Sequence, residues 1–234
     1  MSVFGELRDA AARANNEIAD AGLVLAAFGN ASQVDRREAV FAIKPSGIPC
    51  RKVTADDMVV IALDDGEVVW GENRPSSDTP THRAIYNGID VVGGVAHTHS
   101  LFATAWAQAR LPIPCLGTTH ADHFRGPVPV TRPLTPDEIA GEYEINTGRV
   151  IVEMFGTGGL HPDEVPGALV ASHGPFAWGS SAASAVAMAA AMEMMAELAS
   201  RTLAIRSGQP PLDAPLLDRH FNRKHGPMAY YGQP

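Results

Sequence analysis

The chain has little cysteine, no segment of signal-peptide character and no excess of positive charge, and each shortage excludes a class of protein. Its 234 residues include only two cysteines, Cys50 and Cys115, which form no CxxC pair. Two thiols cannot build a disulfide framework, so we expect free thiols in a reducing, cytoplasmic setting. The net charge of -8 argues against a general affinity for nucleic acid or acidic lipid.

Long hydrophobic runs are also missing from the start of the chain, where charged residues interrupt residues 1–23. The most apolar later segment, residues 182–199, contains Glu193 and Glu197 and therefore predicts a buried helix rather than a membrane span. Hydrophobic residues make up 45% of the chain and charged residues 19%, which is typical of a globular protein. No repeat or linker interrupts the sequence, so a single domain over residues 1–234 is expected.

Hydrophobic periodicity and turn residues predict interleaved helices and strands. Helices are expected at residues 3–21, 81–87, 102–109, 135–147 and 181–206, and strands at 23–28, 40–43, 58–63, 67–70, 91–99, 128–130 and 169–172. Thr135 and Glu138 form a capping box at the start of the fourth helix, with Pro136 at its first position. The last 25 or so residues are expected to contain two proline-bearing turns and a polar, aromatic tail. Hairpins among interleaved elements indicate a layered, mixed α/β fold.

The sharpest chemical signal is the pair of histidines His97 and His99 at the end of the predicted strand 91–99. Alternate residues of a strand point to one face, so the two imidazoles are expected side by side. His173 follows another apolar strand and precedes a glycine. Three neutral imidazoles with one open position are the ligand pattern of catalytic zinc. Manganese and cobalt remain open on ligand type alone, and an ordinary histidine pair is the plainer interpretation.

Asp78 is the natural carboxylate for such a centre, because it lies in a polar stretch just before a predicted helix. The same stretch, with Ser76 and Ser77, is equally typical of a helix N-cap without chemistry. Hydroxyls and free amides at a helix start also suit a phosphate group.

A second candidate phosphate site is the turn that contains Lys44, Ser46 and Gly47. Glycine lets backbone amides approach an anion, serine adds a hydroxyl and lysine adds charge. A tight turn with a surface lysine explains the same residues, and Asn30 after Gly29 is equally typical of a turn.

Asp122 and Tyr231 are capable of acid–base chemistry, but their spacing does not place them near the histidines.

Taken together, a series of ordered sequence blocks resembles the class II aldolase/epimerase family. They are GNASQVDR, KPSG, TADDMVV, PSSDTPTHRAIYN, AHTHS, ATAWAQA, GTTHAD, GEYE, HGPFAWG and RKHG followed by AYYGQ. The blocks run from Gly29 to Gln233 and so cover nearly the whole chain. The resemblance implies an α/β fold with a central mixed, largely antiparallel sheet layered between helices.

The resemblance also implies a set of site residues. The metal ligands would be His97, His99 and His173, with Asp78 as a fourth ligand or near-ligand, and the metal most typical of this set is Zn²⁺. Asp122 and Tyr231 would be the acid–base pair. The substrate and phosphate group would be bound by Asn30, Lys44, Ser46, Gly47, Ser76, Ser77, Thr118, His220 and Arg223.

In this family Tyr231, His220 and Arg223 would come from a neighbouring subunit, which implies a homo-oligomer, a C4 tetramer, with active sites between subunits. The implied partner is a small sugar phosphate, with neither nucleic acid nor membrane. Asp78 in place of the glutamate of the aldolases favours an epimerase, which would convert L-ribulose 5-phosphate to D-xylulose 5-phosphate by retro-aldol cleavage and re-addition. Phe102 departs from the histidine common in the family's epimerases and leaves the substrate less certain than the metal.

Other functions stay open at the level of sequence. A sugar-phosphate aldolase or a decarboxylase of a 3-keto sugar acid phosphate would use the same metal site. A non-haem iron oxygenase needs two histidines and a carboxylate, and the third histidine argues against it. A non-catalytic protein that binds metal or sugar phosphate would require no acid–base pair.

Overall fold

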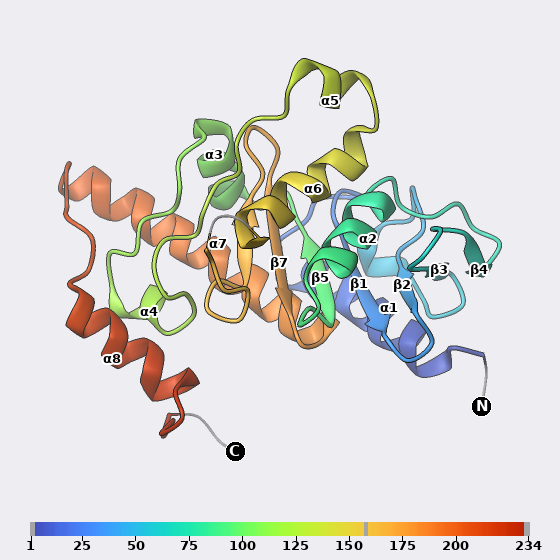
Figure 1. The fold of residues 1–234 in the computed structure, drawn as a ribbon, viewed down its shortest axis with the longest axis horizontal. Coiled ribbons are helices and arrows are strands. Elements are labelled where there is room, and N and C mark those ends of the chain that lie inside the picture. The colour runs from blue at the N-terminus through green and yellow to red at the C-terminus, as the bar shows by residue number, and fades with distance from the viewer. Residues whose placement is uncertain (1–2, 157–158, 232–234) are drawn as a thin grey trace.

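A computed structural model describes residues 3–156 and 159–231, and a seven-stranded sheet runs through its centre (Figure 1). The strands lie in the order β4-β3-β2-β1-β5-β7-β6, and every neighbouring pair is antiparallel. A parallel contact occurs at an isolated bridge between Val130 and Leu169. The strands are β1 Asn30–Asp35, β2 Val40–Ile43, β3 Val59–Ala62, β4 Val68–Trp70, β5 Gly94–His97, β6 Gly167–Leu169 and β7 Pro175–Gly179.

Helices cover both faces of the sheet. They are α1 Gly5–Asp20, α2 Thr79–Gly88, α3 Leu101–Ala109, α4 Thr118–Ala121, α5 Pro136–Ala140, α6 Tyr143–Gly156, α7 Ala182–Ile205 and α8 Ala214–His225, with a short 3₁₀ turn, η1, at Cys50–Lys52. On one face α1 and α7 pack against β1, β5 and β7, and α3 packs on α7. On the other face α2 packs beside α6. The layered arrangement is the one that the sequence predicts.

Alternation along β5 divides the core between these two faces. Ala96 belongs to the cluster under α1 and α7, and Val95 belongs to the cluster under α2 and α6. His97 is two residues beyond Val95, so the pleat of the strand turns its side chain toward the α2–α6 face, where it meets Phe176. The sheet therefore carries one histidine directly into the protein interior.

The helix α7 is long and apolar enough, by composition, to cross a membrane, but half of its most apolar window is buried inside the protein. Ala185, Met192 and Ala196 are part of the cluster that lies against the sheet. The helix therefore packs as a core helix, as the sequence predicts. Cys50 and Cys115 are both buried free thiols.

The predicted strand at residues 23–28 is wrong. This segment is a loop in which Leu25 and Phe28 are exposed, and the strand β1 begins only at Asn30. The sequence did not predict β1, because several of its side chains are polar and find hydrogen-bond partners inside the protein. Ser32, for example, bonds His82 and Tyr86, and Gln33 accepts a hydrogen bond from the backbone of Ala182.

The predicted helix at residues 135–147 is in fact two helices. The capping box at Thr135 is confirmed, but α5 ends at Ala140, where Gly141 adopts a non-helical backbone, and α6 then runs to Gly156. The strand expected at 91–99 is shorter, since β5 ends at His97. Residues 128–130 form isolated bridges rather than a strand.

The C-terminal third differs most from expectation. The predicted strand at 169–172 is replaced by a hairpin of β6 and β7, and β7 itself was not predicted because prolines and glycines flank its short apolar run. The helix α8 occupies a region that was expected to hold turns. A proline near its start suits the first turn of a helix and was interpreted as a turn residue. Gly232 and Gln233 of the last sequence block lie outside the described residues.

Candidate metal centre

Three imidazoles from two distant parts of the chain converge at one end of β5. The ligand atoms of His97, His99 and His173 all lie within 4.8 Å of one another. His97 is the last residue of β5, His99 lies between β5 and α3, and His173 lies in the turn between β6 and β7. Because β5 pairs with β7, this turn is brought beside the end of β5.

His97 and His99 lie close together as predicted, but the alternation of side chains along a strand is not the reason. His99 lies beyond the end of the strand, so the regular alternation of side chains does not reach it. The two Nε2 atoms are nevertheless 3.1 Å apart. The irregular backbone after His97 brings the rings together edge to face.

His97 is held in one orientation. Its Nδ1 is 3.0 Å from the backbone carbonyl oxygen of Pro175, and its ring stacks on Phe176 with centroids 4.1 Å apart. A hydrogen bond from Nδ1–H to a carbonyl leaves the Nε2 lone pair free for a metal. Burial is the main cause that lowers the pKa of His97 to about 3, and this keeps the ring in its neutral, metal-binding form.

The other two rings are also neutral. Burial is the leading cause that lowers the pKa of both His99 and His173. The hydroxyl of Tyr143 lies 3.4 Å from Nδ1 of His173. Tyr143 begins α6, so this helix reaches the centre through its first residue.

The donor set fits a divalent metal ion of the zinc type. Three neutral imidazole nitrogens are a common ligand set for catalytic zinc, with nitrogens about 2.0–2.1 Å from the ion. A separation of 3.1 Å between two Nε2 atoms agrees with two nitrogens sharing one such ion. The same set also accepts manganese or cobalt.

Asp78 lies beside this centre but outside the group of closely spaced ligand atoms. It occupies the N-cap position of α2 without making a side-chain cap, so the plain N-cap interpretation does not account for its carboxylate. That carboxylate accepts a hydrogen bond of 2.6 Å from the amide of Asn30. Burial raises the pKa of Asp78, but the imidazoles of His97 and His82 and the Asn30 amide together bring it below its usual value.

The predicted phosphate residues lie in two loops that meet. Pro45 and Pro75 form an isolated bridge, which places the loop at Lys44 against the loop that leads to Asp78. Ser76 contacts the amide of Asn30 at 3.2 Å, so Asn30 links this loop to β1. Ser46, Gly47 and Ser77 are exposed, and their groups are open to solvent.

Lys44 differs from the surface lysine of the plainer interpretation. It is 2% exposed, and its ammonium donates to the carbonyl oxygens of Pro45 and Ile48. Burial is the main cause that lowers its pKa, and the neighbouring Cys50 and Asp78 oppose this effect. The ammonium therefore lies beneath the loop rather than on its surface.

A second group of predicted residues gathers around the end of α4, α8 and the segment that follows α8. The carboxylate of Asp122 accepts hydrogen bonds from Arg223 at 2.7 Å and 3.1 Å and contacts His220 at 3.0 Å. The guanidinium of Arg223 lies 4.5 Å above the ring of Tyr231. Burial raises the pKa of Asp122, but the hydrogen bonds from Arg223 and His220 outweigh it and hold it below the usual value, so the carboxylate is ionised.

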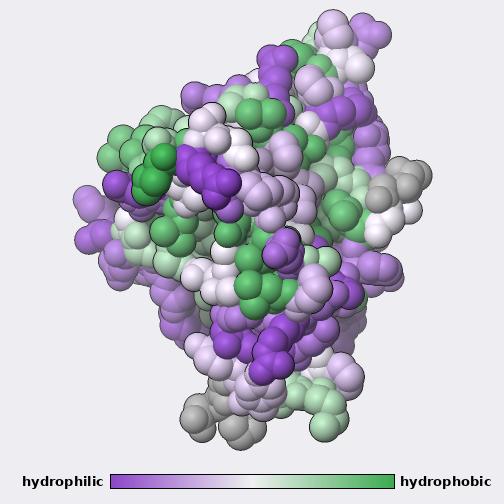
Figure 2. Space-filling view, turned by 90° about the vertical axis from the view of Figure 1, so that its left-hand side faces the viewer, coloured by the Kyte–Doolittle hydropathy of each residue, from purple (hydrophilic) through white to green (hydrophobic). Residues whose placement is uncertain are grey.

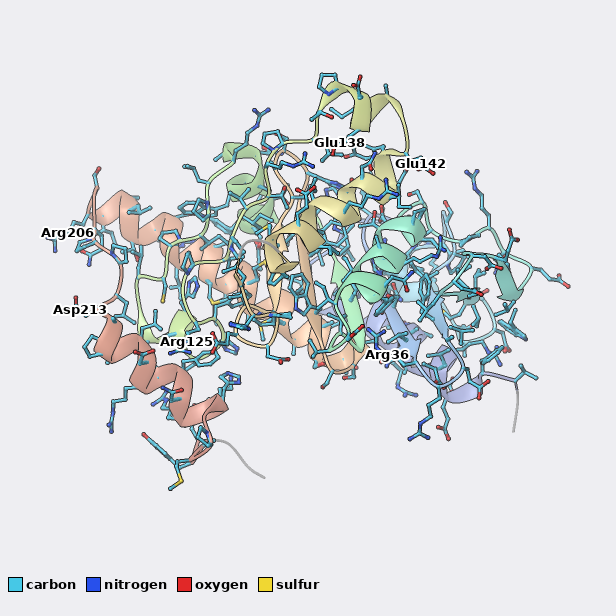
Figure 3. All side chains as sticks on the ribbon, viewed as in Figure 1. Arg36, Arg125, Glu138, Glu142, Arg206 and Asp213 are labelled. Carbon is cyan, nitrogen blue, oxygen red and sulfur yellow. The ribbon has the colours of Figure 1, made fainter. Side chains whose placement is uncertain are left out.

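This second group is separate from the histidine triad within the chain. Among residues 3–156 and 159–231, no hydrogen bond or ion pair joins it to His97, His99 or His173. Figure 1 shows α4 and α8 together at one end of the molecule, while β5 lies near its middle. Arg125, labelled in Figure 3, also ties the segment after α4 to α8 through Asp218.

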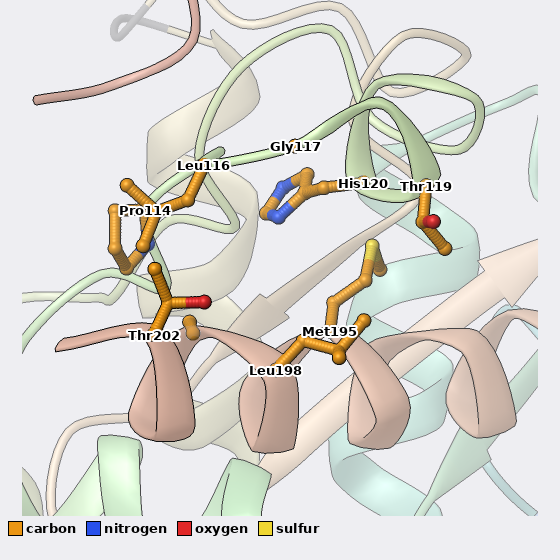
Figure 4. Close-up of a pocket in the computed structure, with 9 residues that line it drawn as sticks. Pro114, Leu116, Gly117, Thr119, His120, Met195, Leu198 and Thr202 are labelled. Carbon is orange, nitrogen blue, oxygen red and sulfur yellow. The ribbon is translucent and has the colours of Figure 1, made fainter. Parts of the chain in front are cut away.

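Thr118 is the first residue of α4, and its neighbours Gly117 and Thr119 line a cavity of about 200 Å³ between α4 and α7 (Figure 4). The cavity is lined mainly by apolar side chains, including Met195 and Leu198, together with His120. No residue of the triad lines it. This cavity therefore does not coincide with the candidate metal centre.

Two residues that contact the triad were not singled out from the sequence. Tyr143 and Phe176 both lie inside the sequence blocks that carry the family resemblance, but nothing in their spacing links them to a histidine. The partner of Nδ1 of His97 is a backbone carbonyl, which carries no side-chain signal at all.

Comparison with known protein families gives one family match, to the class II aldolase and adducin N-terminal domain, over residues 9–200. The sequence is 51% identical over 220 residues to an L-ribulose-5-phosphate 4-epimerase UlaF of Salmonella paratyphi A (strain ATCC 9150 / SARB42). That match covers 94% of this chain and 95% of the relative. The protein of the same name from Salmonella typhi matches to the same extent.

Solved structures share the fold at low sequence identity. An L-fuculose 1-phosphate aldolase superposes with a TM-score of 0.78 at 23% identity, covering 93% of this chain and 95% of the other. YgbL from Klebsiella pneumoniae, described as a putative aldolase/epimerase/decarboxylase, superposes with a TM-score of 0.73 at 23% identity, covering 92% and 97%. At such identities these likenesses establish the fold alone.

Proposed function

Because this chain belongs to the class II aldolase and adducin N-terminal domain family, we propose that it is a metal-dependent L-ribulose-5-phosphate 4-epimerase. The identity of 51% over nearly the full length of an epimerase of that name supports the substrate. The observation that carries the mechanism is the convergence of His97, His99 and His173 within 4.8 Å. The reaction inverts C4 of the sugar and gives D-xylulose 5-phosphate.

We assign the metal to the three imidazoles, with Zn²⁺ as the ion that their chemistry favours. A divalent ion held there supplies a Lewis acid for the oxygens of the sugar. Asp78 acts beside it, because its ionised carboxylate interacts electrostatically with His97 and His173, and the Asn30 amide donates to it. In this position Asp78 either completes the ligand set or balances the charge of the ion.

The phosphate group is assigned to the paired loops around Ser46 and Ser77. Their exposed hydroxyls and the backbone amide of Gly47 are able to donate to phosphate oxygens. The buried ammonium of Lys44 adds positive charge beneath the loop, and Asn30 connects the loop to the metal centre through Asp78. A phosphate held in this way keeps the cleaved fragment from leaving before it is added back.

Asp122 and Tyr231 are proposed as the proton-transfer groups. The C4 hydroxyls of substrate and product lie on opposite faces, so two groups are needed. Asp122 is ionised and so suited to accept a proton, and the phenol of Tyr231 is able to donate or accept one. Arg223 hydrogen-bonds the Asp122 carboxylate and lies over the Tyr231 ring, and His220 contacts the same carboxylate. Thr118 begins the short helix that ends just before Asp122.

We propose that the active site is assembled between subunits of a homotetramer. Within one chain the proton-transfer group and the triad are held by different elements, and no hydrogen bond or ion pair joins them among the residues described. The protein surface also exposes large apolar side chains: Leu101, Met194, Leu198 and Ile205 are 44% to 88% exposed. Figure 2 shows hydrophobic areas among hydrophilic ones on the face that lies at the left of Figure 1. Burial of such areas between subunits would stabilise an assembly.

The experiment that tests the proposal combines metal analysis with a direct assay. Purified protein is expected to carry close to one divalent ion per chain and to convert L-ribulose 5-phosphate to D-xylulose 5-phosphate, followed by NMR. Removal of the ion by a chelator should abolish turnover, and zinc should restore it. Accumulation of free cleavage fragments without inversion would instead indicate an aldolase, and full activity in the metal-free protein would refute the metal's role.

A further inference from the structure

Glu193 stands out among the charged residues that the mechanism above does not use. It lies on α7, is half-buried, and aims its carboxylate at the start of α3. Its two oxygens accept hydrogen bonds from the backbone amides of Phe102 and Ala103, both at 2.8 Å. One carboxylate therefore binds two amides that a helix leaves without a partner in its first turn.

The start of α3 depends on this carboxylate because no local cap replaces it. Ser100 occupies the N-cap position but makes no side-chain cap. A negative charge at a helix N-terminus is favourable, and charge-assisted hydrogen bonds to amides are stronger than neutral ones. A second anchor holds the other part of the helix, where Trp106 donates to Ala196 and Ser200 of α7. The helix α3 is thus attached to α7 at two points.

The position of α3 matters because His99 lies only two residues before its first residue. His97 is oriented by the carbonyl of Pro175 and the ring of Phe176, and His173 has a hydroxyl beside its Nδ1. Among the residues that the structure describes, the His99 ring has His97 as its hydrogen-bond partner, and apart from the other two histidines its ring contact is with the exposed Phe28, at 6.3 Å between centroids. No polar group in the described part of the chain orients this ring as the Pro175 carbonyl orients His97, so the place of His99 is set chiefly by its backbone, which lies between the end of β5 and the start of α3.

We propose that Glu193 is a positioning residue for the metal centre: by clamping the first turn of α3 it fixes the backbone that presents His99 to the ion. The inference rests on the metal site proposed above and adds a residue on a distant helix to it. Glu193 acts without touching the metal or the substrate. Glu193 thus fixes the position of His99, just as Pro175 and Phe176 fix the orientation of His97.

The test measures zinc affinity, by competition with a chromophoric chelator, in Glu193→Gln and in a matched control. Glu197→Gln removes a carboxylate one turn later on the same helix, where it pairs with Arg201 and not with α3. Loss of a residue that orients a metal ligand typically weakens metal binding about 10- to 100-fold. We expect at least a tenfold loss in Glu193→Gln and wild-type affinity in Glu197→Gln.

A double-mutant cycle separates positioning of His99 from general support of the fold. In a His99→Ala background, Glu193→Gln should cause no further loss of zinc affinity, because the ligand through which it acts is gone. Equal losses in both backgrounds, or wild-type affinity in the single variant, would overturn the proposal. If Glu193→Gln does not fold, as judged by circular dichroism, Glu193→Asp takes its place in the same cycle.

The outcome also separates this inference from the proposed function. A wild-type chain that binds no zinc would overturn both. Normal zinc binding by the wild type, unaffected by the change at Glu193, would overturn only the role of Glu193.

Discussion

At the residue scale, burial keeps several imidazoles of this protein neutral. Burial is the main cause that lowers the pKa of His82 and of His120 to about 4, and that of His97 to about 3. For His97 this matches the needs of a metal ligand, which binds through its neutral form. His120 instead lines the apolar cavity between α4 and α7, where its Nε2 has no partner among the described residues. Burial thus lowers the pKa both of a proposed metal ligand, His97, and of a histidine that lines a cavity, His120.

These shifts make the stability of the metal-free protein depend on pH. An unfolded histidine has a pKa near 6.5 and binds protons that the folded His120, at about 4, does not. The contribution of His120 to the free energy of unfolding is therefore fully present above pH 6.5 and is lost as the pH falls toward 4. Between pH 7 and pH 5 a single such residue contributes a loss of about 2 kcal/mol. His120→Phe should remove this part of the difference in unfolding free energy between pH 7 and pH 5, as measured by urea unfolding at both pH values.

The matched control is His161→Gln, because His161 is exposed. It should leave the difference in stability between the two pH values unchanged. If His120→Phe also leaves this difference in stability unchanged, burial of the His120 ring does not lower its pKa as assigned.

A second prediction at this scale separates metal binding from proton transfer. Tyr231→Phe should keep its zinc and lose activity by roughly 100- to 10,000-fold, because general acid–base groups contribute that much. His97→Ala should lose zinc and activity together, because it removes a ligand. Metal content per chain and kcat, measured on the same preparations, distinguish the two. Wild-type turnover in Tyr231→Phe would remove the tyrosine from the mechanism.

At the scale of elements, the close contact of α2 with α6 depends on glycine. A Cβ on Gly148 would lie 2.6 Å from the Cβ of Ala84 and 2.7 Å from the carbonyl oxygen of Thr81, so the helices would have to separate. This contact lies over the cluster that surrounds Phe176, the ring on which His97 stacks. The position of α2 also sets that of Asp78 at its N-terminus.

Gly148→Ala is therefore expected to destabilise the protein by about 1–3 kcal/mol, the usual cost of overpacking, despite the better helix propensity of alanine. Gly156→Ala on the same helix meets nothing within 4 Å and should be neutral or slightly stabilising. Chemical denaturation of both variants provides the measurement. Equal stability of the two would mean that α2 and α6 adjust freely.

At the scale of the whole molecule, the decisive feature is that two chemical groups occupy separate parts of one chain. The triad lies at the end of β5, and Asp122 lies just after α4 in contact with Arg223, which stacks over Tyr231 in the C-terminal segment. If neighbouring subunits bring them together, inactive variants should complement each other. Mixed assemblies of His97→Ala and Tyr231→Phe would then contain sites with an intact triad from one subunit and an intact tyrosine from the next.

Co-expression of these two variants in equal amounts should restore about a quarter of the wild-type activity, because half of the triads and half of the tyrosines are intact and they combine at random. Each variant expressed alone provides the baseline. If the mixture shows no more activity than the sum of the two variants, each active site must be complete within a single chain.

Much of the local structure follows from short stretches of sequence. The capping box at Thr135 and the helix at residues 182–205 were predicted because neighbouring residues decide them. The strand β1 was missed because its polar side chains find buried partners on distant elements, which no local pattern reveals. The helix α8 was missed because its docking on α4 through Asp122 stabilises it.

The same division applies to the candidate site. By itself the sequence determined which side chains are able to bind a metal, since ligand chemistry belongs to the residue type and His97 and His99 are neighbours in the chain. Only the tertiary structure decided that His173 joins them, that Glu193 caps the helix after His99 and that Arg223 meets Asp122. These contacts span roughly 75 to 100 residues, and their formation depends on the order of strands in the sheet and the packing of helices on it. Local periodicity carries no information about either.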